Sequence, residues 1–459
     1  MQGIGLWFKR IWALLLTPII LLTGASASVM TLAGEDAITA TPKEYVYDND
    51  RLLLGAYNAW LLDNHASLPR LAKDAGLDFL VSRVNEDFLD VCAAAGIGVI
   101  AGNYNAPTAY YTISADAENA WLNLSGAAYK AHPALWGDDL IDEPTSKEFA
   151  KISGMLGQYA TLNTGRLPYI NLFPIYANEE QLGNAPQMGA LQYLLPGTTY
   201  GDAQLDKYRR HTADYIKTID TDYISVDIYP YKVTGTNDNW LHNLDILAEA
   251  CRDTQRGLWV ITQAAGNAVN GTDGTSQRWC DKKSDQLQQS YASLAFGAKA
   301  VIYACFQTGW WDVDSHMVNP AGETTGTYDA VKAVNAELAP FAKLYGAYTW
   351  LGAYTHNSPK AAGLRYELSN GLPAAQRPEI CSRDGLLVGC FQETAGEGKA
   401  YVVTNMMELL DEKTAQCTLT FPAGKTVTVY GGGETKVYGN GGEISLTLAP
   451  GDGRFITVD

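Results

Sequence analysis

The stretch HPALWGDDLIDEP, residues 132–144, reads as a short buried strand that ends in carboxylates. Its apolar beginning is typical of a core strand, while the two residues before the final proline are Asp142 and Glu143. Ionised carboxylates are costly to bury, so their position needs a structural or chemical reason. A barrel of parallel strands supplies one, because its active sites lie at the carboxyl ends of the strands.

Eight short apolar segments alternate with helical segments between residues 51 and 346. The predicted strands cover 51–60, 77–84, 97–105, 135–143, 167–176, 223–231, 258–266 and 300–311. The segments between them place apolar residues at helical spacing. Strands alternating with helices predict a parallel sheet covered on both sides, and eight units favour a closed (β/α)8 TIM barrel over an open doubly wound sheet.

The pattern changes after residue 346. The remaining 347–459 contain short β-type runs separated by glycine-rich turns, without helical periodicity. We expect an all-β domain, a β-sandwich, in this region. The predicted fold class is therefore α/β, with a (β/α)8 catalytic barrel at 51–346 followed by a C-terminal all-β domain at 347–459.

The first 27 residues are typical of a secretory signal peptide, and 28–50 read as a linker. Lys9 and Arg10 precede the apolar run IWALLLTPIILL, and the small residues ASA stand at 25–27. The run is short for a membrane span and contains Pro18. We expect a secreted, extracellular protein without a stable membrane partner after cleavage. An uncleaved N-terminal anchor is the alternative.

Composition narrows the range of partners. A formal net charge of -17 over 459 residues disfavours nucleic acid, while neutral or cationic ligands remain compatible with it. The chain has 27 Tyr and 11 Trp, whose rings suit sugars but also fill cores. No cysteine–histidine cluster has zinc spacing, and the sequence predicts neither a metal nor another cofactor. It leaves the oligomeric state open.

Two carboxylates are the main catalytic candidates. Strand alternation groups Asp139, Ile141 and Glu143 on one face and puts Asp142 with Leu140 on the other. If the second face packs against the helices, Glu143 faces the barrel mouth, where partial burial suits a general acid. The alternative is an acidic first turn of the next helix.

The segment YISVDIYPY, 223–231, repeats the same logic. Its apolar face leaves Ser225, Asp227 and Tyr229 on the other side, directed into the barrel. Asp227 is then a second acid in the same cavity. Its alternative role is that of a buried aspartate that binds a lysine or backbone amides.

Further polar and aromatic residues fall at predicted strand ends. Amides at these positions suit sugar hydroxyl groups, and tryptophans suit sugar rings. The candidate substrate-binding residues are Asn58, Asn105, Asn171, Tyr229, Gln263, Gln307, Trp310 and Trp311.

Three segments together resemble glycoside hydrolases of the β-galactosidase-like clan. They are HPALWGDDLIDEP, DYISVDIYPY and QSYASLAFGAKAVIYACFQTGWW. The chain looks most similar to secreted bacterial proteins with a family 42-like domain. The resemblance implies that Glu143 is the acid/base, although Asp142 stands where the clan usually has asparagine. The clan's nucleophile, a glutamate at the end of strand seven, has no counterpart, because Gln263 occupies that region.

The sequence therefore predicts a glycoside hydrolase that cleaves O-glycosidic bonds of a poly- or oligosaccharide by carboxylate acid/base catalysis. Glu143 is the acid, and Asp227 or Asp142 is its partner. The alternatives are a catalytically inactive glycan-binding barrel, and a barrel lyase or isomerase.

Overall fold

A computed structural model gives the structure of the chain. It describes residues 37–40, 43–102, 129, 131–162, 165–183, 202–237, 240–267, 276–357 and 376–459. The predicted signal peptide and Asn105 lie outside these ranges.

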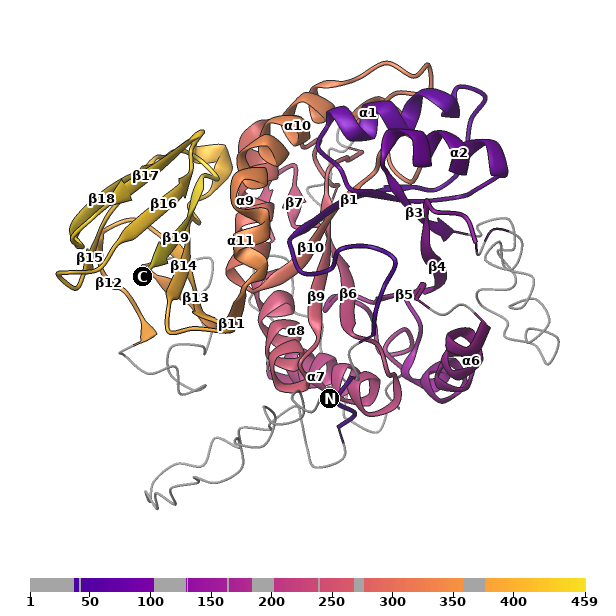
Figure 1. The fold of residues 1–459 in the computed structure, drawn as a ribbon, viewed down its shortest axis with the longest axis horizontal. Coiled ribbons are helices and arrows are strands. Elements are labelled where there is room, and N and C mark those ends of the chain that lie inside the picture. Colours follow the sequence, from indigo (N-terminus) through magenta and orange to yellow (C-terminus); the bar gives the residue numbers. More distant parts are fainter. Residues whose placement is uncertain are drawn as a thin grey trace, which may run out of the picture. The chain divides into compact units, whose positions relative to one another are not determined.

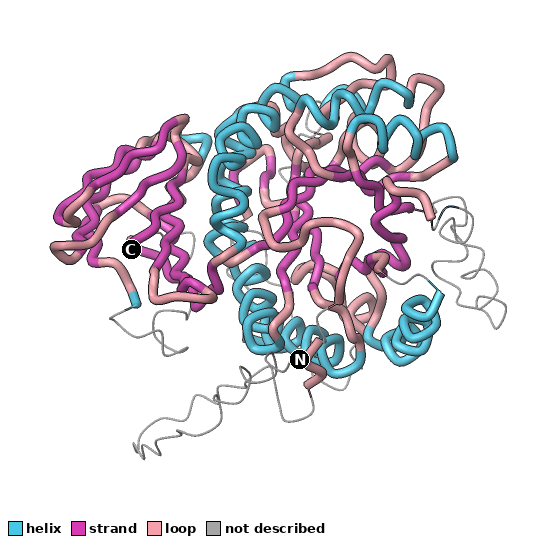
Figure 2. The backbone as a smooth tube through the Cα atoms, in the orientation of Figure 1, coloured by secondary structure: helices cyan, strands magenta, loops and turns pink. Residues whose placement is uncertain are grey.

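Eight parallel strands close into a barrel in the order β1-β10-β9-β6-β5-β4-β3-β2, which Figure 2 shows as a ring of strands. Each strand falls within, or within one or two residues of, a predicted segment. The strands are β1 Leu53–Asn58, β2 Phe79–Ser82, β3 Gly98–Gly102, β4 Leu135–Asp142, β5 Leu167–Leu172, β6 Tyr223–Ile228, β9 Gly257–Gln263 and β10 Ala298–Ala304. The predicted barrel is thus confirmed.

Helices pack around the barrel (Figure 1). They are α1 Leu68–Asp74, α2 Glu86–Ala95, α6 Phe149–Leu162, α7 Asp202–Thr218, α8 Trp240–Thr254, α9 Lys283–Ala295, α10 Gly326–Leu338 and α11 Ala342–Gly346. Sequence signals explain several of their ends. Gly96 ends α2 at a φ of 69°, which glycine adopts without strain. Thr145 and Glu148 form the capping box that leads into α6.

Alternation along the strands separates two apolar cores. One fills the interior of the barrel with rings and branched chains such as Tyr57, Phe79 and Trp259. The other lies between the strands and the helices and includes Leu54 and Val226. The apolar strands therefore close the barrel as a packed core and leave the strand ends for polar residues.

Two antiparallel sheets follow the barrel. One has the order β11-β13-β14-β19-β16-β17 and the other β12-β15-β18. Their strands are β11 Tyr348–His356, β12 Glu379–Ser382, β13 Leu386–Glu393, β14 Lys399–Asn405, β15 Ala415–Phe421, β16 Val427–Gly431, β17 Glu434–Tyr438, β18 Gly442–Leu448 and β19 Gly453–Val458. A small hairpin, β7 Tyr231–Lys232 and β8 Gly235–Thr236, belongs to the barrel region. The predicted all-β character is confirmed, and the exact boundary at 346/347 stays a prediction.

Helix α9 contacts both the barrel and the C-terminal strands. The indole N–H of Trp350 donates to the carbonyl of Ala295 at 2.8 Å. The amide of Gln288 donates to the carbonyl of Asn405 at 3.1 Å. In the part of the chain that the structure describes, no helix is long and apolar enough to cross a membrane.

Candidate active site

A bulge in β4 decides which carboxylates enter the barrel. The pairing of β4 with β5 shifts its register between Asp139 and Ile141. As a result Leu140 and Ile141 both join the core beneath the helices, while Asp139 accepts a hydrogen bond from Tyr57 inside the barrel at 2.7 Å. The prediction that Asp142 shares the outer face with Leu140 is wrong, because the extra residue of the bulge reverses the alternation after it.

Asn171 connects two of the acidic residues. Its side-chain nitrogen donates to Asp142 at 3.1 Å and to Asp227 at 2.8 Å. Its side-chain oxygen accepts from the hydroxyl of Ser225 at 3.0 Å, and that hydroxyl lies 2.7 Å from the hydroxyl of Tyr169. Three neighbouring strands thus contribute to one buried hydrogen-bond network.

Glu143 directly follows β4 and turns the chain sharply. Its φ is 49°, and its backbone N–H donates to the carbonyl of Asn171 at 2.8 Å. Trp311, after β10, has a φ of 72°. Non-glycine residues in this left-handed region carry strain of roughly 1–3 kcal/mol, and such residues cluster at functional sites. Two of the predicted site residues therefore have the backbone strain that functional positions often show.

Burial and like charges favour protons on these carboxyls. Burial raises the pKa of Glu143 to about 9, and the charges of Asp227 and Asp142 act in the same direction. Burial and then Asp142 raise the pKa of Asp227 to about 7, against hydrogen bonds from Asn171, its own backbone and the Tyr229 hydroxyl. Burial also raises the pKa of Asp142. Near pH 7 to 8 Glu143 keeps its proton, while Asp227 ionises more readily.

Four aromatic rings, those of Tyr57, Tyr229, Trp310 and Trp311, pack against one another. The Tyr229 and Trp311 ring centroids are 4.7 Å apart, and those of Trp310 and Trp311 are 5.7 Å apart. Trp310 also meets Tyr57 edge to face at 5.6 Å. Burial and then the charge of Asp227 raise the pKa of Tyr229, so Tyr229 is the ring that lies near the acids. The predicted Tyr229, Trp310 and Trp311 therefore come together.

The loop after β10 carries Trp310 and Trp311 and is called the aromatic loop below. It is held by His316, which was not among the predicted site residues. Its two ring nitrogens each lie 2.9 Å from a backbone carbonyl oxygen, one of Gln307 and one of Trp310. The imidazole is fully buried. Only the folded loop brings these carbonyls to the ring, so a single sequence carries no signal for this role.

A second unpredicted residue is Tyr208 of α7. Its hydroxyl donates to the carbonyl of Phe173 at 2.9 Å. Burial and then the charge of Asp227 raise the pKa of Tyr208, and Glu143 adds to this effect. Tyr208 therefore lies near the acids on the side of α7. Its helical position made it indistinguishable from an ordinary core tyrosine.

Two of the predicted substrate-binding amides, Asn58 and Gln307, connect loops. The side-chain oxygen of Asn58 accepts from the backbone N–H groups of Gln307 and Thr308 at 3.2 and 3.1 Å. The amide of Gln307 donates to Asn64 at 2.9 Å. Asn58 and Gln307 are fully buried. Their hydrogen bonds connect the end of β1 to the segment after β10, which leads into the aromatic loop.

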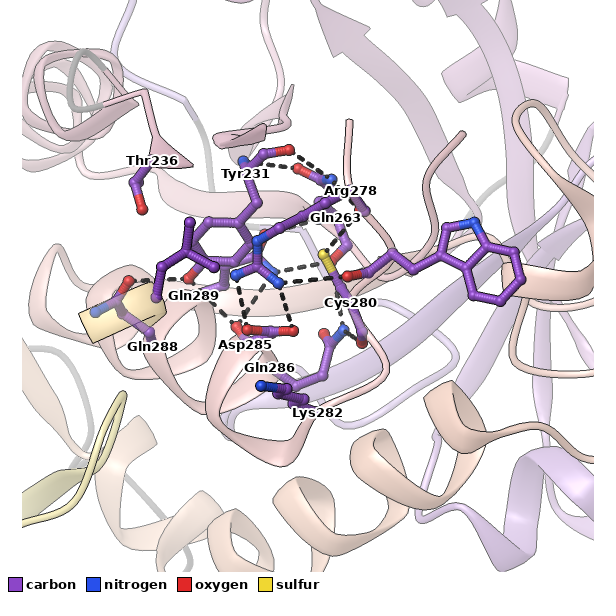
Figure 3. Close-up of polar contacts among 12 residues, drawn as sticks. Tyr231, Thr236, Gln263, Arg278, Cys280, Lys282, Asp285, Gln286, Gln288 and Gln289 are labelled. Carbon is purple, nitrogen blue, oxygen red and sulfur yellow. Dashed lines mark hydrogen bonds and ion pairs between the residues drawn. The ribbon is translucent and has the colours of Figure 1, made fainter. Parts of the chain in front are cut away.

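Gln263 has a similar structural role at the end of β9 (Figure 3). Its oxygen accepts from the backbone N–H of Tyr231 at 2.9 Å, and its nitrogen donates to the carbonyls of Tyr231 and Arg278. Arg278 pairs with Asp285 through two contacts of 2.8 Å and lies 4.7 Å from the centre of the Tyr231 ring. This network fixes Tyr231, two residues after Tyr229.

A cavity of about 580 Å³ lies elsewhere, between the first turn of α9 and loops of the C-terminal strands. Its lining carries charges of both signs and no aromatic ring, and no residue of the carboxyl cluster contributes to it. Across the described ranges, no group of three or more His, Cys, Asp or Glu side chains is suited to hold a metal.

No protein-family model matches the chain, and neither does any curated protein. Among solved structures, one described as "Glycoside hydrolase" has 12% identity and a TM-score of 0.47, covering 91% of this chain and 96% of that chain. An α-L-fucosidase GH29 from Bacteroides thetaiotaomicron has 10% identity and a TM-score of 0.45, with 92% and 96% covered. The GH99 endo-α-mannosidase from the same organism has 11% identity and a TM-score of 0.41, with 65% and 99% covered. Likenesses at these values carry no argument about activity, and the family 42-like resemblance stays a prediction.

Proposed function

We propose that this chain is a glycoside hydrolase in which Glu143 is the general acid and Asp227 its ionised partner. The supporting observation is the contrast between two carboxyls in one cluster. Asp227 accepts a hydrogen bond from Asn171, which favours its ionised form. Glu143 lies beside two other carboxyls, which favour its protonated form. Environments that separate two pKa values in this way suit an acid and a base.

In the proposed reaction, Glu143 transfers its proton to the glycosidic oxygen while the bond to the anomeric carbon breaks. The leaving sugar departs as an alcohol. Asp227 either attacks the anomeric carbon or takes a proton from the water that attacks it. If Asp227 attacks, water then cleaves the glycosyl–Asp227 bond, with Glu143 taking the proton of that water. Water is added across the glycosidic bond in both cases. The negative charge of the cluster stabilises the positive charge that develops on the sugar ring.

The substrate of the proposed enzyme is a poly- or oligosaccharide. Trp310, Trp311 and Tyr229 offer aromatic surface at the acids, and Trp311 is only half-buried. Aromatic faces stack against the apolar faces of sugar rings. Residues 1–27 further support a secreted enzyme, which N-terminal sequencing of the mature protein would test.

The decisive experiment compares two carboxamide variants on 2,4-dinitrophenyl glycosides and on plant and bacterial oligosaccharides. Glu143→Gln removes the proposed acid. Asp138→Asn is the matched control, because Asp138 belongs to the same strand but accepts a hydrogen bond from Tyr159 of α6. We expect the wild type and the control to release reducing sugar from an oligosaccharide, and Glu143→Gln to release none.

Other outcomes separate the alternatives. Glycan binding by the wild type without turnover of any glycoside would favour the inactive glycan-binding barrel, for which the absence of an acid at Gln263 is the supporting feature. Release of an unsaturated sugar or an isomer, without addition of water, would favour the lyase or isomerase.

A further inference from the structure

Asp142 and Asp227 come from different strands, yet the side chain of Asn171 holds them close together. One carboxylate oxygen of each contacts the same nitrogen of Asn171, at 3.1 and 2.8 Å. Two atoms bound to one nitrogen lie within about 6 Å of each other. An inverting pair needs roughly 6.5–9.5 Å. The spacing therefore disfavours an inverting pair, and the shared donor links the two aspartates.

We propose that Asn171 is a positioning residue that holds Asp142 and Asp227 as one pair, and that this pair acts together as the partner of Glu143. The inference rests on the proposed function and deepens it, since it gives Asn171 a role other than substrate binding. It also gives Asp142 a role as the second member of the pair.

The orientation of the Asn171 amide follows from the groups behind it. The amide oxygen can only accept, so the hydroxyl of Ser225 donates its single proton to it at 3.0 Å. The hydroxyl of Tyr169, 2.7 Å from that of Ser225, must then be the donor in their contact. A chain of donors therefore runs from Tyr169 through Ser225 to Asn171 and ends on the two aspartates. A reversed amide would direct its oxygen at both carboxylates.

The network explains how two neighbouring carboxyls are accommodated inside a barrel. Asn171 and Ser225 are buried at 2% and 0% exposure, so water does not replace their hydrogen bonds. One N–H group of the amide serves each aspartate. Two carboxyls in such contact titrate as a coupled pair, with one proton held while the other group is ionised.

The first test needs no substrate and follows carboxyl protonation by difference infrared spectroscopy. The variants are Asn171→Ala and Ser225→Ala, and folding is checked by circular dichroism. The control is Asn335→Ala, which removes a buried amide that binds Tyr303 and a backbone carbonyl but no carboxylate. We expect the first ionisation of the pair to move upward by about one pH unit in Asn171→Ala, because a donor to the charged form is lost. Ser225→Ala should give a smaller shift, and Asn335→Ala none.

The second test uses the 2,4-dinitrophenyl glycoside that the wild type cleaves. Asn171→Ala should lower kcat by about 10- to 100-fold with KM nearly unchanged, which is the loss expected for the one hydrogen bond to the ionised member of the pair. Asp142→Asn, Asp227→Asn and the double variant complete a cycle. If the aspartates act as one pair, the double variant is no slower than the slower single variant.

Three results would overturn the inference. They are an unchanged carboxyl titration in Asn171→Ala, a raised KM with an unchanged kcat in that variant, and rate losses that multiply in the double variant. If no glycoside is cleaved, the proposed function fails, but the infrared titration still decides whether Asn171 holds the two aspartates as a pair.

Discussion

The side-chain nitrogen of Asn171 lies 2.8 Å from a carboxylate oxygen of Asp227 on the neighbouring strand. The backbone carbonyl of the same Asn171 accepts from the N–H of Glu143, also at 2.8 Å. One residue of β5 therefore contacts the carboxylate of Asp227 and the backbone of Glu143, the two residues to which we assign the chemistry. It favours the ionised form of Asp227 and leaves Glu143 among like charges, which favour its protonated form.

The plot of kcat/KM against pH should be bell-shaped. Asp227, with its pKa near 7, must lose its proton, and Glu143, with its pKa near 9, must keep it. Activity then falls as the pH drops through about 7 and as it rises through about 9. We expect kcat/KM to be highest near pH 8, measured on an aryl glycoside in buffers of constant ionic strength. A maximum below pH 5 would contradict this assignment.

The effect of Glu143→Gln should depend on the leaving group. A poor leaving group needs protonation, whereas dinitrophenolate departs without it. On a natural glycan, the kcat of the variant should fall by at least about 100-fold. On the dinitrophenyl glycoside, the variant should keep much of its rate. Its alkaline limb should also disappear.

Asp227→Asn should instead slow both substrates alike, because both need the same attack on the anomeric carbon. Full activity of Glu143→Gln on the natural glycan would show that another residue is the acid.

Tyr229 and Tyr159 each have a hydroxyl group that interacts with an aspartate, so their phenylalanine variants can be compared directly. Tyr229→Phe removes a hydroxyl that lowers the pKa of Asp227, so the acid limb of the pH profile should move to higher pH. Tyr159→Phe removes a hydroxyl that donates to Asp138 at 2.8 Å on the outer side of the barrel. That variant should lose about 1 kcal/mol of stability and keep the wild-type pH profile. Equal shifts in the two variants would argue against the assignment of Asp227.

Glu143 should also lower the stability of the folded chain at alkaline pH. The pKa of Glu143 is raised from 4.5 to about 9 in the folded chain. The favourable contribution of its protonated form is therefore complete below pH 4.5 and lost as the pH rises through 9. Glu143→Gln has no such loss, so its Tm should exceed that of the wild type by about 2 °C or more at pH 8.

The comparison is made by scanning calorimetry, and the difference should vanish near pH 4.5. A variant that is less stable than the wild type at pH 8 would mean that Glu143 has a favourable ionised partner.

The sequence by itself determined the order of strands and helices and much of the candidate site. Apolar runs such as YISVDIYPY set their two faces by local backbone geometry, because successive side chains of a strand point to opposite sides. Asp227 and Tyr229 could therefore be placed on the inner face without knowledge of any neighbour. The helix cap at Thr145 and Glu148 is equally local, because its partners are three residues apart.

The tertiary structure decided what depends on neighbouring strands. The bulge between Asp139 and Ile141 is a property of the pairing with β5, and it turns Asp142 inward against the simple alternation. Asn171 hydrogen-bonds to Asp227, which lies 56 residues further along the chain. The side chain of Gln263 makes its hydrogen bonds to the backbone of Tyr231 and Arg278. An inward-facing amide looks the same in sequence whether it binds a sugar, a carboxylate or a loop. Only closure of the barrel fixes the strand registers, and with them the hydrogen-bond partner of each buried polar group.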